Sequence, residues 1–486
     1  MGKFAKLFGF DKKVTTAKTE IMAGIVTFLA MAYILTLNPD LILGEAYPQL
    51  WSSVFIATAL GGFIGTFLMA VLAKLPLAQA PGLGLNSMVG GLLAGTLIGV
   101  PLTFGNAMLL VLASGVIFLL MSVVKIRKVS IREIMYKAIP ESIRNAISVG
   151  IGLFIAIIGL ANAGIVTTGA GTVVGMVQFS SWDMEMIGPA LVCLVGFFVM
   201  TILSHFNVKG SVIIGIIAAT LFGMIPAIGV TEWSGESWKF WEHFQGFFSM
   251  NTEDGGAFLA VFTEGFHFEE NVPIMSLVMV VITFCMIDMF DTMGTCVGCC
   301  SAAGLMTEDG LPVRYNQIMM SDSIATTCGA LIGTSTVTTF VESGAGISAG
   351  GKTGVAALTT ALLFLCSIFF LPVFASIPKA AASAALIWVG CLMLQGVKDV
   401  KVDEVKDFVP SFLTIAMMPF GYSITTGIGL GILSYVLIGI CDYVVKAIAY
   451  ACSNKEDKVK PAWDLHVVLL IIAALFVVYF FVPVSF

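Results

Sequence analysis

Three carboxylates stand inside a stretch of the chain, residues 272–353, that is otherwise apolar enough to lie in lipid. They are Asp288, Asp291 and Glu342. An ionised side chain near the centre of a bilayer costs roughly 3 kcal/mol even on lenient insertion scales. Carboxylates are therefore expected there only where they face a site, so this stretch is where function is expected.

The chemistry open to these carboxylates is hydrogen-bond acceptance and proton carriage. Asp288 and Asp291 are three residues apart, so on a helix both face one side. Burial and like-charge neighbours favour the protonated form of a carboxylic acid. All four His of the chain fall at segment ends or in loops, so Glu342 or one of the Asp residues is the expected proton carrier. The alternative is that the carboxylates only tie helices together by hydrogen bonds.

The elements that must position these residues are transmembrane helices. The chain has 486 residues, of which 58% are hydrophobic and only 11% charged, whereas globular domains carry about 25% charged residues. Windows of about 20 apolar residues, long enough to span a bilayer, recur along almost the whole chain. We predict an all-α polytopic membrane protein without a large soluble domain. The predicted spans lie near 21–43, 52–73, 77–98, 103–124, 143–162, 187–205, 211–230, 272–298, 316–334, 335–352 (broken), 354–376, 380–397, 408–421 and 424–447.

The basic residues predict which segments are cytoplasmic. Residues 1–20 hold five Lys, and residues 125–144 hold six Lys or Arg against two Glu. Residues 231–271 hold eight Asp or Glu against one Lys. We expect a cell-membrane protein with a cytoplasmic N-terminal tail (1–20) and an acidic extracytoplasmic loop (231–271). Residues 448–486 add a basic loop and an apolar segment, 465–484, whose placement the pattern leaves open. The net charge of −6 comes largely from the outer loop, so no nucleic-acid partner is inferred.

Two other motifs could indicate a functional site and are considered beside the carboxylates. The string GISAGGKT (346–353) matches the phosphate-loop pattern, but a membrane-length segment follows it and no soluble α/β domain surrounds it. The run CVGCC (296–300) has no His near it, and buried Cys usually behaves as a small hydrophobe. We expect no nucleotide, metal or other cofactor. An intramembrane aspartyl protease would need two Asp on different helices, whereas Asp288 and Asp291 share one, so no enzymatic activity is expected.

A weak similarity between two segments of the chain predicts the architecture. The segments LPLAQAPGLGLNS (75–87) and GTSTVTTFVESGAG (333–346) each place a short extended run before a glycine-rich helix start. Each stands third in its half of the chain. We therefore predict two inverted repeats of seven spans, residues 21–230 and 272–447, with spans 3 and 10 broken. In such folds the substrate site lies near the midplane, where broken helices meet.

Four motifs, in order, resemble those of the AzgA-like purine permeases, a branch of the nucleobase/ascorbate (xanthine/uracil) transporter family. They are TEIMAGIVTFLAMAYILTLNP (19–39), APGLGLN (80–86), DMFDTMGT (288–295) and TSTVTTFVESGAGISAGGKTG (334–354). The resemblance implies a core domain (spans 1–4 and 8–11), a gate domain (spans 5–7 and 12–14), and short strands in spans 3 and 10. It also implies proton-driven uptake of hypoxanthine, guanine or adenine. We expect a homodimer whose gate stays still while the core moves.

The same resemblance implies roles for individual residues. Asp288 and Glu342 are implied as base-binding carboxylates, and Asp291 as a coupling or supporting carboxylate. Asn86 is implied as the polar residue of span 3 that recognises the base. Ala80, the first residue of the same motif, belongs to the implied substrate-binding residues. Asp288 is accordingly expected to touch the base more directly than Asp291.

A purine is planar and neutral, with ring N–H donors beside carbonyl or ring-nitrogen acceptors. A carboxylate accepts from such donors, and an amide both donates and accepts. Phe340, two residues before Glu342, is placed to cover the ring face, with simple packing as the alternative role. An anion or other small-solute transporter of the same fold is the main rival, but three buried carboxylates without a buried Arg suit an anion poorly. A receptor role would leave the broken helices unexplained.

Overall fold

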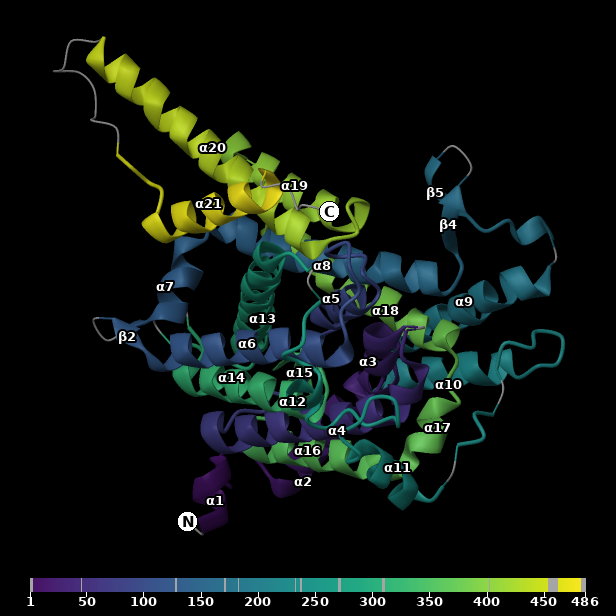
Figure 1. Cartoon of the computed structure of the whole chain (residues 1–486). Helices are drawn as coiled ribbons and strands as arrows, with labels where there is room; N and C mark the ends of the chain where they lie inside the picture. The colour runs from purple at the N-terminus through teal and green to yellow at the C-terminus, as the bar shows by residue number, and fades with distance from the viewer. Residues whose placement is uncertain are drawn as a thin grey trace.

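The computed structural model describes residues 3–44, 46–126, 129–169, 172–181, 183–231, 233–236, 238–269, 272–307, 311–401, 403–452 and 462–481. In this part of the chain nine helices are long and apolar enough to cross a membrane. All nine coincide with predicted spans, and the protein is a mainly helical, multi-pass membrane protein (Figure 1).

The first half of the chain, up to the acidic loop, contributes helices to both of the helix groups described below. Its elements are α1 (Lys3–Phe8), α2 (Ala17–Met31), α3 (Ile34–Leu43), α4 (Trp51–Leu68), β1 (Gln79–Pro81), α5 (Leu83–Leu93), α6 (Phe104–Val123), β2 (Lys125–Ile126), β3 (Val129–Ser130), α7 (Ile131–Ala138), α8 (Glu141–Asn162), β4 (Val166–Gly169), β5 (Thr172–Met176), α9 (Met184–His205) and α10 (Ser211–Gly223).

The second half begins with two short helices in the acidic loop and then contains long helices and a further segment in which a strand precedes a short helix. Its elements are α11 (Phe240–Phe247), α12 (Ala260–Thr263), α13 (Ile274–Ala302), α14 (Tyr315–Ile332), β6 (Val337–Thr339), α15 (Ser343–Ser348), α16 (Gly354–Ser367), α17 (Leu371–Ala375), α18 (Lys379–Met393), a 3-10 segment η5 (Leu394–Asp399), α19 (Val405–Phe420), α20 (Ile424–Ala451) and α21 (Val467–Phe481).

The prediction of a helical fold with short strands in two broken spans agrees with the structure, in which the described residues form three two-stranded sheets. One sheet, β1 with β6, is built from the two extended runs expected in spans 3 and 10. The other two are hairpins in the connections between helices, β2 with β3 and β4 with β5. No strand is predicted in these connections, because hairpins this short leave no apolar alternation to detect.

The strands β1 and β6 pair antiparallel, with Gln79 opposite Thr339. A threonine of the preceding helix satisfies the other edge of each strand. In α4, Thr66 donates to the carbonyl of Gln79 at 2.8 Å and accepts from its N–H at 2.9 Å. In α14, Thr326 donates to the carbonyl of Val337 in β6 at 3.3 Å and accepts from its N–H at 3.1 Å. Extended backbone is tolerated at membrane depth only when its polar groups are paired in this manner.

The helices pack into two groups. In the first, α16 packs on α2 and α4, α14 packs on α4 and α6, and α13 packs on α6. In the second, α8 packs on α18 and α19, α9 on α10 and α18, and α19 on α20. Close approach of glycines holds the second group together, since a Cβ added at Gly390 would lie 2.6 Å from the carbonyl oxygen of Gly152. In Figure 1, α2, α4 and α16 lie together away from α19, α20 and α21.

The segment left unplaced by the sequence, 465–484, forms α21 up to Phe481; its last three residues lie outside the described part. This helix packs on α20 and begins beside its middle, with Leu465 against Gly439. Farther along, Phe476 and Phe480 pack on Gly429. The two helices therefore run antiparallel, and α21 belongs to the second group. The KEDKVK run that precedes it lies outside the described residues.

Candidate functional site

A cavity of about 300 Å³ lies where the two broken spans begin their helices. We call it the carboxylate cavity. The start of α5 contributes Leu83 and Gly84, and the residues before α15 contribute Phe340, Val341 and Glu342. Its other walls come from the break between α2 and α3, from β6, and from α13, α8, α18 and η5. They are Tyr33, Ser148, Ile151, Ile155, Asp291, Gly294, Thr295, Gly298, Thr339, Val389, Leu392, Met393, Gln395, Gly396, Lys398 and Asp399.

The structure brings only part of the predicted site to this cavity. Glu342 and Phe340 line it, as does Asp291. Three predicted substrate-binding residues do not line it; they are Asp288, Asn86 and Ala80. Ala80 is buried in β1, opposite Thr338 of β6, where it supports the strand pair.

Glu342 is held by a residue that the sequence did not single out. The hydroxyl of Tyr33 donates to its Oε1 at 2.5 Å, and Tyr33 lies at the break between α2 and α3. Both side chains line the cavity and both are buried. The first span is thus interrupted at the point where it touches the carboxylate. Tyr33 was within reach of sequence reasoning, because it is the only tyrosine in the motif 19–39.

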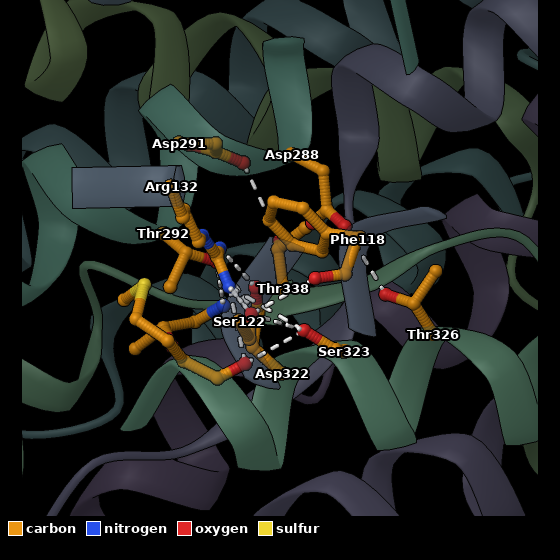
Figure 2. Close-up of polar contacts among 12 residues, drawn as sticks. Phe118, Ser122, Arg132, Asp288, Asp291, Thr292, Asp322, Ser323, Thr326 and Thr338 are labelled. Atoms are coloured by element: carbon orange, nitrogen blue, oxygen red, sulfur yellow. Dashed lines mark hydrogen bonds and ion pairs between the residues drawn. The ribbon is translucent and has the colours of Figure 1, made fainter. Parts of the chain in front are cut away.

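Asp288 and Asp291 lie on the same helix, α13, but have different surroundings (Figure 2). Asp288 is 2% exposed, and its Oδ2 accepts a hydrogen bond from Thr326 at 3.2 Å. Its Oδ1 has no hydrogen-bond partner among the described residues. Asp291 accepts from Thr338 of β6 at 3.4 Å and faces the cavity. Of the two, Asp291 lines the cavity and Asp288 does not, whereas the resemblance implies that Asp288 contacts the base more directly.

Asn86 is turned away from the cavity. It is fully buried, its Oδ1 accepts from the hydroxyl of Ser335, and its Nδ2 has no partner in the described part of the chain. In this arrangement the amide joins α5 to the residues before β6. For Asn86 to contact a substrate in the carboxylate cavity, α5 or its neighbours would have to shift.

Sequence reasoning missed a buried ion pair behind the site. Arg132 of α7 is fully buried, and its Nη2 donates to Asp322 of α14 at 2.9 Å. Its guanidinium lies 3.3 Å from the ring centroid of Phe118, and its Nη1 donates to the carbonyl of Met319 at 3.1 Å. Figure 2 shows this cluster beside the two Asp residues of α13.

Asp322 extends this network toward the strands. Its Oδ1 accepts from Thr292 at 2.7 Å and from the side chain of Gln79 at 3.2 Å. The expectation of three buried carboxylates without a buried Arg is therefore wrong on both counts. Asp322 carries the same signal as Asp288, a carboxylate inside an apolar window. Arg132 carried no such signal, because it lies in a basic stretch that resembles any cytoplasmic loop.

A carboxylate of the protein itself binds to the segment that matches the phosphate-loop pattern. The carboxylate of Glu20 accepts from the backbone N–H groups of Lys352 (3.0 Å), Thr353 (3.2 Å) and Ala356 (3.3 Å), and from the Thr353 hydroxyl (2.8 Å). Glu20 is fully buried. Backbone N–H groups at a helix start favour an anion, and here the start of α16 holds the carboxylate of α2. The motif is a helix-to-helix anchor.

Comparisons with known proteins agree with this architecture. A family model described as "Permease family" matches residues 18–430. The guanine/hypoxanthine permease PbuO of Bacillus subtilis is 36% identical over 434 residues, which cover 89% of this chain and 94% of that protein. The adenine permease AdeQ of Escherichia coli is 34% identical over 442 residues, which cover 90% and 91%. The family and these relatives are permeases and not enzymes.

A solved structure supports the fold alone. The transmembrane domain of the cyanobacterial bicarbonate transporter BicA superposes with a TM-score of 0.56 at 14% sequence identity. The match covers 85% of this chain and 97% of that one. It shows that the helices of the two proteins are arranged alike.

Proposed function

Because the chain belongs to the permease family, we propose that it is a secondary transporter that imports purine nucleobases together with protons. The observation that carries this proposal is the carboxylate cavity, where two broken spans start their helices beside Glu342, Asp291 and Phe340. Its volume of about 300 Å³ suits a small planar solute. Relatives of similar length that carry guanine, hypoxanthine or adenine in their names support the purine class.

The cavity offers the contacts that a purine needs. The carboxylates of Glu342 and Asp291 accept hydrogen bonds from ring N–H groups, and Phe340 supplies an apolar face. The first N–H groups of α5 have no partner within their own helix, so they can serve the acceptors of the base. Those of α15 already donate to the carbonyls of residues 340–342. Glu342 is the proposed proton carrier, with Asp288 and Asp291 as its supporting carboxylates.

An anion transporter of the same fold is the alternative, and the charges of the site disfavour it. The buried Arg132 is engaged by Asp322 and does not line the cavity. Among the described residues, the cavity lining contains three carboxylates, Asp291, Glu342 and Asp399, against one cation, Lys398. Lys398 and Asp399 lie at its exposed end, so the titratable groups toward the buried end are the carboxyl groups of Asp291 and Glu342 and the hydroxyl of Tyr33.

Uptake by proteoliposomes tests the function. We expect labelled hypoxanthine, guanine or adenine to accumulate when the outside is acidic, and accumulation to fall when a protonophore collapses the gradient. Labelled bicarbonate is the matched solute for the alternative. Accumulation of bicarbonate without any purine would contradict the proposal, and purine accumulation driven by sodium alone would contradict its proton part.

The two Asp residues of α13 give a prediction about direct contact. Asp291→Asn is expected to weaken base binding about tenfold or more, since a hydrogen bond to a charged group contributes ~1.5–3 kcal/mol. Asp288→Asn is expected to bind the base almost as before and to change the pH dependence of uptake. Binding by equilibrium dialysis and uptake at several pH values would be measured on both variants. The reverse pair of results would restore the order implied by the resemblance.

We also propose that the two groups of helices are the core and gate of an inverted repeat of seven plus seven spans. Thr66 forms the same two backbone hydrogen bonds with β1 that Thr326 forms with β6. This correspondence supports the repeat, because the second span then binds the third span as the ninth binds the tenth. The core carries the site past a static gate, which a homodimer contact holds in place. We also propose that the N-terminus lies in the cytoplasm of a cell-membrane protein, as the basic residues predict.

A disulfide across the boundary tests this motion. Ser148 of α8 and Thr295 of α13 line the same cavity from opposite groups, so a cysteine pair there, in a background without the native Cys, is expected to stop uptake on oxidation. Reduction should restore uptake. The control pair replaces Gly196 and Ala384, whose Cβ atoms would lie 3.1 Å apart within the second group, and its crosslink should leave uptake intact. Full uptake with both pairs crosslinked would exclude relative motion of the groups.

A further inference from the structure

A second and larger cavity, of about 700 Å³, lies farther along the same helix boundary. We call it the tyrosine cavity. The helix α8 contributes Ile151 and Ile155 to the carboxylate cavity and Phe154, Ile158 and Asn162 to this one. The two cavities therefore occupy successive depths along α8.

A narrow contact lies at the boundary between the two depths. A Cβ added at Gly84 would lie 3.2 Å from Ile424 and 3.3 Å from Ile151. Gly84 lines the carboxylate cavity and Ile424 lines the tyrosine cavity. The two spaces are thus neighbours across one layer of small and aliphatic groups.

The walls of the tyrosine cavity combine aromatic rings with a fixed carboxylate. The rings of Phe154 and Tyr422 meet edge to face, with centroids 5.5 Å apart. Asp40 lines the cavity, and its Oδ1 accepts a hydrogen bond from the indole N–H of Trp51 at 2.8 Å. Aromatic faces suit a planar heterocycle, and a carboxylate accepts from its N–H groups. These are the same two kinds of contact that the carboxylate cavity offers.

Tyr422 is held in an unusual backbone conformation. Its φ is +48°, and a bulky residue at positive φ is an outlier that persists only where the surroundings demand it. The strain falls in the short turn between α19 and α20, and it aims a ring into the tyrosine cavity. Glycine would have served the turn without strain.

A second tyrosine reaches the cavity from α21. Tyr479 lines it, and the packing of Phe476 and Phe480 on Gly429 fixes its helix against α20. The family model ends at residue 430, so this wall comes from a part of the chain beyond the family match. Because α21 belongs to the second group of helices, Tyr479 would stay with the gate when the core moves.

We propose that the tyrosine cavity is a second, weaker binding site for a nucleobase, with Tyr422 and Tyr479 as stacking walls and Asp40 as the hydrogen-bond acceptor. This inference rests on the proposed function. The base would occupy this site before or after the carboxylate cavity, on the side that the basic residues predict to be outside. The site binds without any chemical change in the base.

Equilibrium binding of labelled hypoxanthine, guanine and adenine to the purified full-length chain tests the proposal. The wild type is expected to bind a base at two sites, and Glu342→Gln, which disables the carboxylate cavity, to keep the weaker one. Adding Tyr479→Ala or Tyr422→Ala to Glu342→Gln should weaken the remaining site about tenfold, the effect of losing one stacked ring. Adding Tyr479→Phe should retain it.

Tyr443→Ala is the matched control, because Tyr443 lies on α20 but packs on Trp463, with ring centroids 5.0 Å apart. It should leave both sites unchanged. If the wild type accumulates a purine while Glu342→Gln binds none of the three bases, the second site is refuted and the transport function stands. A remaining site that is indifferent to both tyrosine truncations also refutes it. A wild type that neither binds nor accumulates any of the three overturns the transport function, and the second site with it.

Discussion

Replacing Glu342 by Gln is expected to abolish concentrative purine uptake while the protein still folds and inserts. Gln has nearly the same size, and its carbonyl oxygen can still accept the hydrogen bond from Tyr33, which lies 2.5 Å from the carboxylate. An amide cannot take up and release a proton in the way a carboxylic acid does. Uptake by proteoliposomes under an inward proton gradient should therefore fall to the level of empty liposomes.

The control for this variant is Glu253→Gln, an exposed carboxylate in the acidic loop, which should transport like the wild type. A monodisperse profile in size-exclusion chromatography checks that both variants are folded. Tyr33→Phe is expected to lie between the two, because it removes one hydrogen bond and leaves the proton carrier in place. Wild-type accumulation by Glu342→Gln would remove Glu342 from the mechanism.

Removing the cation of the buried ion pair should have the largest effect on stability. Arg132→Met leaves Asp322 as an unpaired buried charge, and breaking such a pair costs about 3–5 kcal/mol. We expect a strongly lowered midpoint of thermal unfolding in detergent and a low yield of folded protein. The double variant Arg132→Met with Asp322→Asn removes the stranded charge and should recover most of the loss, since Asn can still accept from Thr292 and Gln79.

Lys137→Met is the matched control, since Lys137 lies on the same helix α7 and pairs with Glu133 at the surface at 2.7 Å. An exposed pair contributes about 1 kcal/mol or less, so this variant should unfold near the wild-type midpoint. Equal losses for Arg132→Met and Lys137→Met would show that the buried pair does not govern the fold. Failure of the double variant to recover stability would point to the stacking of Arg132 on Phe118 instead.

The sequence was sufficient to predict the membrane spans, the two broken spans and the class of protein, because these features follow from local composition. It was less informative about contacts. The spacing of Asp288 and Asp291 places both on one side of α13, yet three residues turn a helix by less than a full circle, and only Asp291 lines the cavity. The cost of burying charge applied to Asp322 as much as to Asp288, so that carboxylate could have been predicted.

Other features were outside the reach of sequence reasoning. Arg132 is buried because α7 folds back on α6 and α14, and no local pattern distinguishes it from the other basic residues near it. The same holds for Glu20, whose partners at the start of α16 are far away in sequence. Both contacts depend on the tertiary arrangement, in which a residue near a helix end meets a distant segment.

The strand pair β1 with β6 has a consequence for biogenesis. Thr66 is made before Gln79 and can cap one edge of β1 as soon as the segment inserts. The other edge waits for Val337 to Thr339, which emerge about half a chain length later. Bare backbone is not tolerated in lipid, so the nascent third span must remain beside water, the translocon or earlier helices until the tenth arrives. The first half of the chain is thus expected to mature only after synthesis of the second half, which makes the two halves interdependent in assembly.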